Sequence, residues 1–146
     1  MLFTKFAEGL EAVIFISLHS GADPVSSKQI SQYQDVLPRH LEPVLQVLVK
    51  DGILKGTKGP RGGYTLAREK RKLMVGEIFR ALSKDPIKRI KNKNGECNCI
   101  RKNITSKIND EIAENISQYL NKTTIEDLCK KIEEDRKVEE KTDFNI

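Results

Sequence analysis

A turn rich in glycine and proline, set between two short apolar segments, constrains the fold of this chain more than any other feature. The turn reads Lys58-Gly59-Pro60-Arg61-Gly62-Gly63, and residues 53–57 and 64–66 flank it. Two short apolar segments around such a turn predict a β-hairpin. The turn lacks the Gly-Lys-Ser/Thr ending of a nucleotide-binding loop, so its glycines do not indicate a nucleotide site.

Three segments with helical spacing of apolar residues precede the hairpin. The first begins near Phe3 and should end near Gly21, and the second opens with Ser26 and Gln29 in capping-box spacing. The third should begin near Arg39, which keeps Pro43 close to the first turn, where a proline forfeits few backbone bonds. Two short helices followed by a basic hairpin predict a winged helix-turn-helix.

The rest of the chain predicts further helices. A short helix is expected at residues 73–82, a loop at 83–101 and a long helix at 104–120. Thr123 and Glu126 form a second capping-box pattern that should open a last helix, and the charged tail beyond Glu134 should fray. The fold class is therefore mainly α with a small β-hairpin wing. We divide the chain into a DNA-binding winged helix-turn-helix domain, a sensor or linker loop, and a dimerisation helix with a C-terminal helix, at residues 1–82, 83–102 and 103–146.

The positive charge of the chain is concentrated around the hairpin. Residues 50–72 contain eight Lys or Arg against two acids, whereas residues 126–143 contain eight acids against five bases. This asymmetry favours a polyanion such as double-stranded DNA as partner, although ordinary solvated surface would give the same count. No segment is long and apolar enough to span a membrane, and three cysteines without an export signal indicate a cytoplasmic protein. No catalytic set of residues is visible, so an enzyme is not expected.

In a helix-turn-helix the second helix enters the major groove and its first residues face the bases. Arg39 and His40 stand at that end, and Gln46 follows further along. The preceding short helix is expected to hold backbone phosphate through Ser27 and Lys28. The hairpin supplies the remaining contacts, Lys55, Lys58 and Arg61.

The long helix carries one apolar stripe on an otherwise polar sequence. Its members are Ile104, Ile108, Ile112, Ile116, Tyr119 and Leu120. A stripe of that length exceeds what one small domain covers, so we predict a homodimer with Ile108, Ile112, Ile116 and Tyr119 in the interface. The alternative is packing within one subunit.

Several segments also resemble a known family. Residues 41–45, 48–54 and 75–78 fit its pattern, and the specific match is the turn Gly59-Pro60-Arg61-Gly62-Gly63-Tyr64. They are similar to the Rrf-two (Rrf2) family of transcription regulators, of the IscR, NsrR and CymR type. The resemblance implies a winged helix joined to a long dimerisation helix, and a homodimeric regulator, expected to be a repressor, that reads a pseudo-palindromic site.

Cluster-binding members of that family carry three cysteines in the loop before the dimerisation helix, and this chain departs from that pattern. Cys97 and Cys99 lie in that loop, whereas Cys129 falls on the apolar face of the last helix and is expected in the core. An iron–sulfur cluster held by the two loop cysteines with non-cysteine ligands is one hypothesis. Some members of the family recruit an acidic residue from the first helix of the partner subunit, and the resemblance implies Glu8 for that role. A thiol-redox or metal switch is a second, and a cluster-free regulator controlled by a protein partner is a third. A winged-helix module that binds an acidic partner protein is the alternative to DNA binding.

Overall fold

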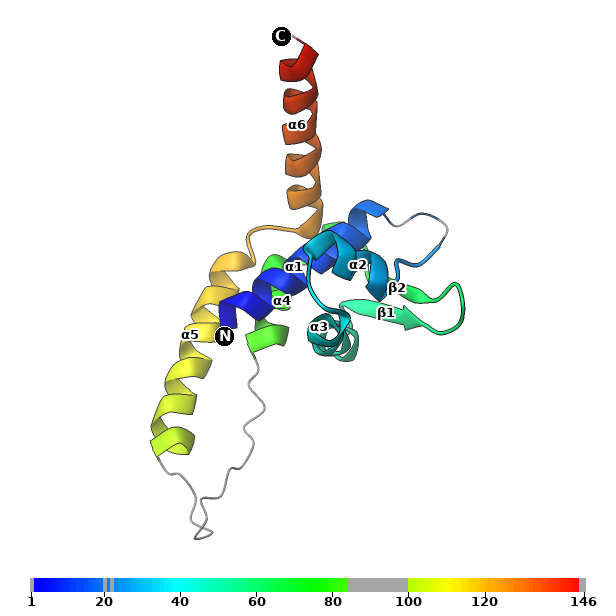
Figure 1. Cartoon of the computed structure of the whole chain (residues 1–146). Coiled ribbons are helices and arrows are strands. Elements are labelled where there is room, and N and C mark those ends of the chain that lie inside the picture. Colours follow the sequence, from blue (N-terminus) through cyan, green and yellow to red (C-terminus); the bar gives the residue numbers. More distant parts are fainter. Residues whose placement is uncertain (1, 20, 22, 84–99, 145–146) are drawn as a thin grey trace.

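The computed structural model describes residues 2–19, 21, 23–83 and 100–144, and in that part the predicted order of elements is confirmed (Figure 1). The winged-helix unit consists of α1 (Leu2–His19), α2 (Ser27–Gln34), α3 (Pro38–Lys50), β1 (Leu54–Thr57) and β2 (Gly63–Leu66). After it come a 3₁₀ turn (Lys70–Lys72), α4 (Val75–Ser83), a π-helical turn (Arg101–Thr105), α5 (Ser106–Leu120) and α6 (Ile125–Phe144). None of the described helices is both long and apolar enough to cross a membrane.

The predicted capping box starts α2. The hydroxyl of Ser26 accepts a hydrogen bond from the Gln29 amide at 3.2 Å, and the Gln29 side chain accepts one from the Ser26 amide at 2.9 Å. The helix ends at Asp35, whose φ of 52° is left-handed and stops the helical path. Ile30 is buried in the core, whereas Tyr33 is 62% exposed.

Helix α3 begins one residue earlier than predicted, with Pro38 in the first turn, where a missing N–H costs nothing. Pro43 consequently lies inside the helix. Pro43 is the sixth residue of the helix, so its missing N–H forfeits the backbone bond to the Arg39 carbonyl, and the buried side of the helix comes from other residues: Leu41, Val44, Leu45 and Leu48. Val49 lies at the edge of the buried side and is 37% exposed.

The hairpin forms with Leu54 opposite Leu66 and Thr57 opposite Gly63. Gly59 turns the chain at a φ of +113°, a conformation that residues with side chains rarely adopt. The sequence did not predict a third strand-like contact: Val25, just before α2, pairs with Tyr64 of β2 in both directions. This contact attaches the hairpin directly to the helix-turn-helix.

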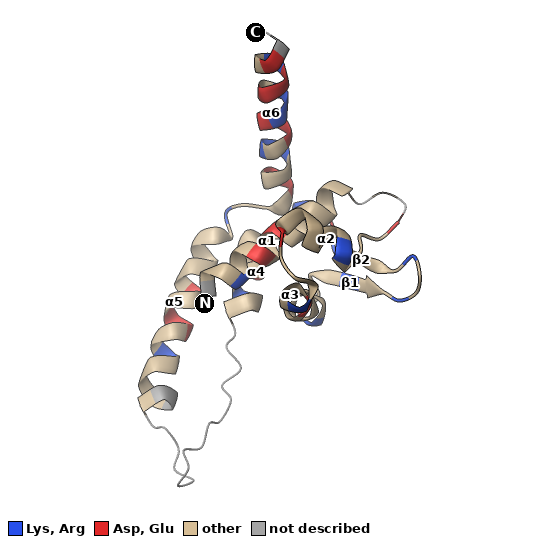
Figure 2. Ribbon diagram, viewed as in Figure 1, with Lys and Arg blue, Asp and Glu red and all other residues tan. Residues whose placement is uncertain are grey.

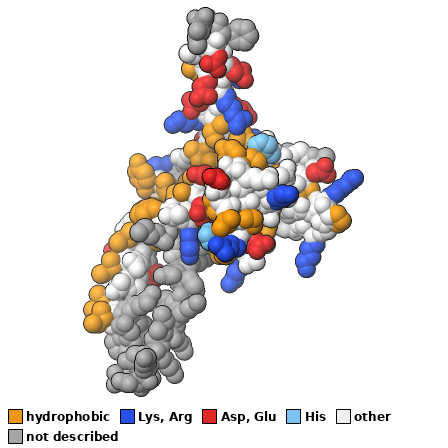
Figure 3. Space-filling view, viewed as in Figure 1, with side chains coloured by type: hydrophobic (Ala, Val, Ile, Leu, Met, Phe, Trp, Pro, Cys, Tyr) orange, Lys and Arg blue, Asp and Glu red, His pale blue; other side chains and the backbone are white. Residues whose placement is uncertain are grey.

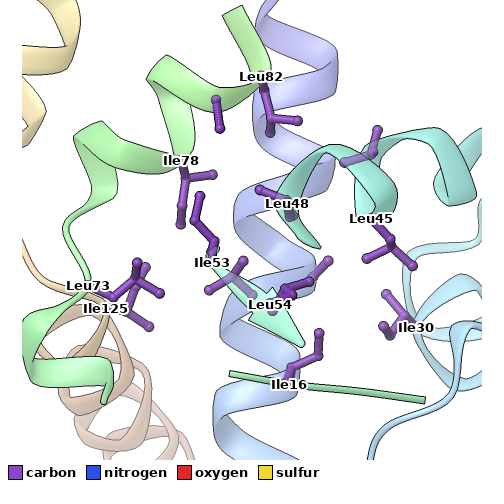
Figure 4. Close-up of a cluster of buried hydrophobic side chains, with 14 of the residues drawn as sticks. Ile16, Ile30, Leu45, Leu48, Ile53, Leu54, Leu73, Ile78, Leu82 and Ile125 are labelled. Atoms are coloured by element: carbon purple, nitrogen blue, oxygen red, sulfur yellow. The ribbon is translucent and has the colours of Figure 1, made fainter. Parts of the chain in front are cut away.

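One apolar core holds these elements together (Figure 4). It contains Ile16 from α1, Leu45 and Leu48 from α3, Leu54 from β1 and Ile78 from α4, all of them at most 2% exposed. The start of α6 joins the same core through Ile125 and Cys129, and Leu73, which precedes α4, is buried in it as well. The core therefore fixes the hairpin and α3 against a common base.

Helix α5 packs against α4, where the Ser117 hydroxyl donates a hydrogen bond to the Gly76 carbonyl at 2.8 Å. Both α5 and α6 extend beyond the core (Figure 1). The prediction that the tail beyond Glu134 frays is wrong, since α6 continues to Phe144. Its sequence is rich in Glu and Lys, which are good helix formers, and Glu126 and Lys130 pair at 3.8 Å at i,i+4 spacing.

Candidate nucleic-acid interface

Helix α3 presents a polar stripe on the side opposite its buried residues. Arg39, Gln46 and Lys50 lie close to the centre of that exposed side, because seven and eleven residues correspond to nearly whole helical turns. His40 is also exposed, but it lies further round the helix. Arg and Gln can each make two parallel hydrogen bonds to one base, so this stripe has the chemistry for reading a major groove.

Glu42 belongs to this surface and was missed by the sequence reasoning. It is exposed, and its charge is the second cause, after burial, that raises the pKa of Tyr64 on β2. Glu42 follows Arg39 by three residues, a spacing that places neighbouring side chains on one side of a helix, and the sequence could therefore have revealed it. A carboxylate on this side can accept a hydrogen bond from the amino group of cytosine.

The hairpin carries exposed positive charge. Lys55, Lys58 and Arg61 are all exposed, and Lys58 and Arg61 make no ion pair with any residue in the described part of the chain. The basic residues that follow the hairpin differ: Arg68 pairs with Glu77 at 2.8 Å, and Arg80 pairs with Glu114 at 3.1 Å. Although the sequence places both groups in or near one basic region, Lys58 and Arg61 add positive charge to the wing that no acidic residue of the described chain pairs with (Figure 2).

A groove of about 590 Å³ separates the wing from the helix-turn-helix. Its walls come from the start of α2, the second half of α3 and the hairpin, including Ser27, Gln46, Lys50, Lys58 and Tyr64. Three of the predicted DNA contacts, Ser27, Gln46 and Lys58, thus meet around one groove. The other five stand outside its lining: Lys28, Arg39, His40, Lys55 and Arg61.

The apolar stripe of α5 faces away from the core. Ile108 is 51% exposed, Ile112 48% and Tyr119 71%, while Ile116 is half-buried. The side of α5 that meets α4 contains Ser117 instead, a small polar residue. Figure 3 shows hydrophobic side chains in a row along α5. In the described structure of one subunit, therefore, this stripe is surface and not core.

The residues of the predicted sensor are only partly described. Cys97 and Cys99 lie outside the described residues. Glu8 is half-buried, and its backbone carbonyl accepts a hydrogen bond from the Gln34 side chain at 2.9 Å. Cys129 is 1% exposed with its sulfur 3.4 Å from the Ser17 hydroxyl, which confirms it as a core residue.

The family model Rrf2, described as an iron-dependent transcriptional regulator, matches residues 2–131. The chain belongs to the Rrf2 family. Members of this family are transcription regulators and not enzymes, which agrees with the wing and the exposed stripe of α3. As an Rrf2 regulator, the chain is a DNA-binding protein built on a winged helix.

Individual relatives of this Rrf2 chain agree with the assignment. It is similar to protein rrf2 of Nitratidesulfovibrio vulgaris, with 31% identity over 88% of this chain and 87% of the relative. It is also similar to the regulator IscR of Xenorhabdus nematophila, with 29% identity over 88% and 79% of the two chains.

Solved structures show the same fold. The structure of IscR from T. potens matches with a TM-score of 0.64 and 31% identity over 90% of this chain and 87% of that one. The cysteine regulator CymR of B. subtilis matches with a TM-score of 0.62 and 28% identity over 87% and 94%. The expectation of a winged helix with an appended long helix is confirmed.

Proposed function

We propose that this chain is a sequence-specific transcription regulator that binds DNA as a homodimer and acts as a repressor. The observation that carries the proposal is the unpaired positive charge of Lys58 and Arg61 on the wing, beside the exposed stripe of α3. A protein that covers an operator hinders access of polymerase to the same DNA. Repression by occupancy therefore requires only this binding surface.

On DNA, the exposed stripe of α3 enters the major groove and the wing meets the neighbouring minor groove. Arg39 suits a guanine, because its guanidinium matches the O6 and N7 acceptors, and Gln46 suits an adenine. Lys58 and Arg61 are drawn to the negative potential of a narrow minor groove. Ser27 and Lys28 at the start of α2 hold the backbone, which sets the register of the other contacts.

The exposed stripe of α5 supports a dimer. Ile108, Ile112 and Tyr119 are large apolar residues that one subunit leaves in water, and a second copy of α5 would cover them. Burial of apolar area contributes roughly 25 cal/mol per Å², so a helix-long stripe favours association. A two-fold dimer presents two copies of α3 and reads a pseudo-palindromic site.

Binding to the DNA upstream of its own gene tests the proposal. Fluorescence anisotropy should show tighter binding to that fragment than to a shuffled duplex, with affinity that falls steeply as salt rises. The competing hypothesis is a winged-helix module for an acidic partner protein. Failure to bind either duplex at low salt would favour that module and contradict the proposal.

The signal sensed by the regulator is a separate question. Most iron–sulfur clusters are held by four thiolates, whereas this chain offers Cys97, Cys99 and the carboxylate of Glu8. Within the described ranges no group of three or more His, Cys, Asp or Glu could hold a metal ion. This donor set falls short of a cluster, so no step of the proposed function runs through one.

A visible absorption spectrum with iron and sulfide assays, on protein purified without oxygen, tests the donor set directly. A coloured protein with about one cluster per subunit would make Cys97 and Cys99 ligands and direct the search to Glu8. A colourless, metal-free protein that still binds DNA would favour thiol oxidation or a regulatory protein partner.

A further inference from the structure

In addition to its packing on the core, the wing forms backbone hydrogen bonds with the residue just before α2 at a place that we call the wing junction, which consists of Val25, Gly63 and Tyr64. The Val25 amide donates to the Tyr64 carbonyl at 3.0 Å, and the Tyr64 amide donates to the Val25 carbonyl at 2.7 Å. The next residue after Val25 is Ser26, whose side chain caps α2. The junction therefore connects β2 of the wing to the first residue of the helix-turn-helix.

Gly63 lets the two backbones approach this closely. A Cβ atom at Gly63 would stand 2.6 Å from the carbonyl carbon of Val25 and 2.9 Å from the amide nitrogen of Ser26. Both are backbone atoms, which cannot rotate away as a flexible side chain would. Any side chain at position 63 must therefore push β2 away from Val25.

The same strand also faces α3. Tyr64 lines the groove together with Gln46 and Lys50 of α3, and Glu42 is close enough for its charge to raise the Tyr64 pKa further than burial does alone. A displacement of β2 thus changes the distance between the wing and the exposed stripe of α3. Figure 1 shows the hairpin projecting beside α3, with no other described element beyond it.

The distance between the wing and α3 determines whether both can contact the same DNA. A helix in the major groove and a wing in the adjacent minor groove lie on two sides of one sugar–phosphate strand, and the two grooves differ in width, at about 12 and 6 Å. Lys58 and Arg61 can reach the minor groove only if the gap between wing and α3 fits that strand. A shift of one or two ångströms at the junction is passed on to the wing tip.

We propose that the wing junction sets the spacing between α3 and the wing tip, and that Gly63 is a positioning residue that acts through Lys58 and Arg61. The inference rests on the proposed DNA-binding function and adds to it a residue that acts through the backbone contact with Val25 and not through a side chain of its own. It also gives a physical reason for glycine directly before Tyr64 in the hairpin.

The test compares Gly63→Ala with Gly56→Ala in the full-length chain. Gly56 lies on β1 opposite Tyr64, and a Cβ there would meet only the Tyr64 ring at 3.9 Å, an ordinary contact. Gly56 and Gly63 both line the groove, so both variants add the same methyl group to the same hairpin and the same groove, but only Gly63→Ala forces backbones apart. Hydrogen exchange should show faster exchange of the Val25 and Tyr64 amides in Gly63→Ala, and parent-like exchange in Gly56→Ala.

DNA binding is then measured in a double-mutant cycle with Lys58→Ala/Arg61→Ala. In the parent and in Gly56→Ala, the loss of both cations should lower the salt slope of log K by roughly 3.6 per dimer. In Gly63→Ala the wing no longer reaches the DNA, so the same loss should change the slope by less than about 0.5. A variant that only folds less well would contain fewer active molecules, but in those molecules Lys58 and Arg61 would still make their full contribution to the salt slope.

Three results overturn the inference. If the Val25 and Tyr64 amides stay protected in Gly63→Ala, the added methyl group does not separate the two backbones at the junction. Faster exchange with an undiminished contribution of Lys58 and Arg61 would show that the junction does not position the wing. A parent protein without DNA binding, or without any contribution of the two cations, would instead contradict the proposed function and remove the basis of the inference with it.

Discussion

Removal of the two cations of the wing is the perturbation with the most direct consequence. Lys58 and Arg61 are exposed and make no ion pair with the described residues, so their replacement by alanine breaks no ion pair of the described chain. Surface substitutions of this kind change stability by about 0.5 kcal/mol or less. Any loss of DNA affinity in Lys58→Ala/Arg61→Ala therefore reports on the interface and not on folding.

The magnitude follows from counterion release. Each cation that neutralises a phosphate on double-stranded DNA contributes about 0.9 to the slope of log K against log salt. A dimer has two wings and hence four such cations, so the slope should become smaller by about 3.6. Between 50 and 200 mM salt, the parent should accordingly lose roughly 150-fold more affinity than the variant.

The assay is equilibrium binding to the upstream fragment and to a shuffled duplex at several salt concentrations. A matched control is Lys137→Ala/Lys141→Ala, which removes the same charge from exposed positions on α6. The control should keep the parent slope, and the wing variant should weaken binding to both duplexes alike. A slope reduced by less than about 1, or an equal reduction in the control, would refute the assignment of the wing contacts.

Three further predictions concern the dimer, the start of α2 and the groove. Ile112→Asp places a charge in the proposed interface and should give monomers by light scattering. Gln118→Glu adds a charge roughly 120° round the same helix and should leave the protein dimeric. A dimeric Ile112→Asp variant would contradict the proposed interface. Ser26→Ala removes the capping hydroxyl and should lower the free energy of unfolding by about 1 kcal/mol in urea titrations, and no change would contradict the role of the cap. The pKa of Tyr64 is raised by burial first and by Glu42 second. The neutral form of Tyr64 therefore stabilises the fold fully at pH values below the ordinary tyrosine pKa, and this contribution is lost as the pH rises through the raised pKa. Glu42→Gln should lower the Tyr64 pKa only in part, as measured by NMR of the ring, and a full return to the ordinary value would contradict burial as the main cause.

The sequence predicted the elements whose signals are local. The Ser26 capping box, the glycine-rich hairpin and the apolar face of α3 each depend on residues within a few positions of one another. Such patterns form the same structure in most surroundings, because the partners are always within reach. The placement of Cys129 in the core followed from helical spacing alone.

The start of α6 shows where local signals are insufficient. Thr123 with Glu126 and Thr124 with Asp127 both fit a capping pattern, and the sequence reasoning chose the first pair. In the structure the Thr123 carbonyl accepts a hydrogen bond from the Val75 amide at 3.0 Å, and Thr124 forms a bridge with Met74 directly before α6 begins at Ile125. The cap is therefore formed by Thr124 and Asp127, one residue later. A contact between segments far apart in sequence decided between two equivalent local patterns.

The wing junction and the closeness of Glu42 to Tyr64 were missed for a similar reason. Val25 pairs with Tyr64 across 39 positions, and neither residue carries a local signal for that bridge. Glu42 lies on the exposed side of α3, but its closeness to Tyr64 is apparent only once the hairpin is folded beside the helix. The candidate interface could thus be predicted as a set of charged residues, whereas its groove needed the tertiary structure.

A hydroxyl-radical footprint on the DNA upstream of the regulator's own gene tests the central claim most directly, because it reports binding, symmetry and groove contacts in one measurement. We predict two protected half-sites related by two-fold symmetry, with centres one helical turn, about 10 base pairs, or a multiple of it apart. Lys58→Ala/Arg61→Ala should lose protection in the minor groove beside each half-site. A footprint confined to one half-site, or no protection at low salt, would contradict the account of a dimer that reads DNA through α3 and the wing.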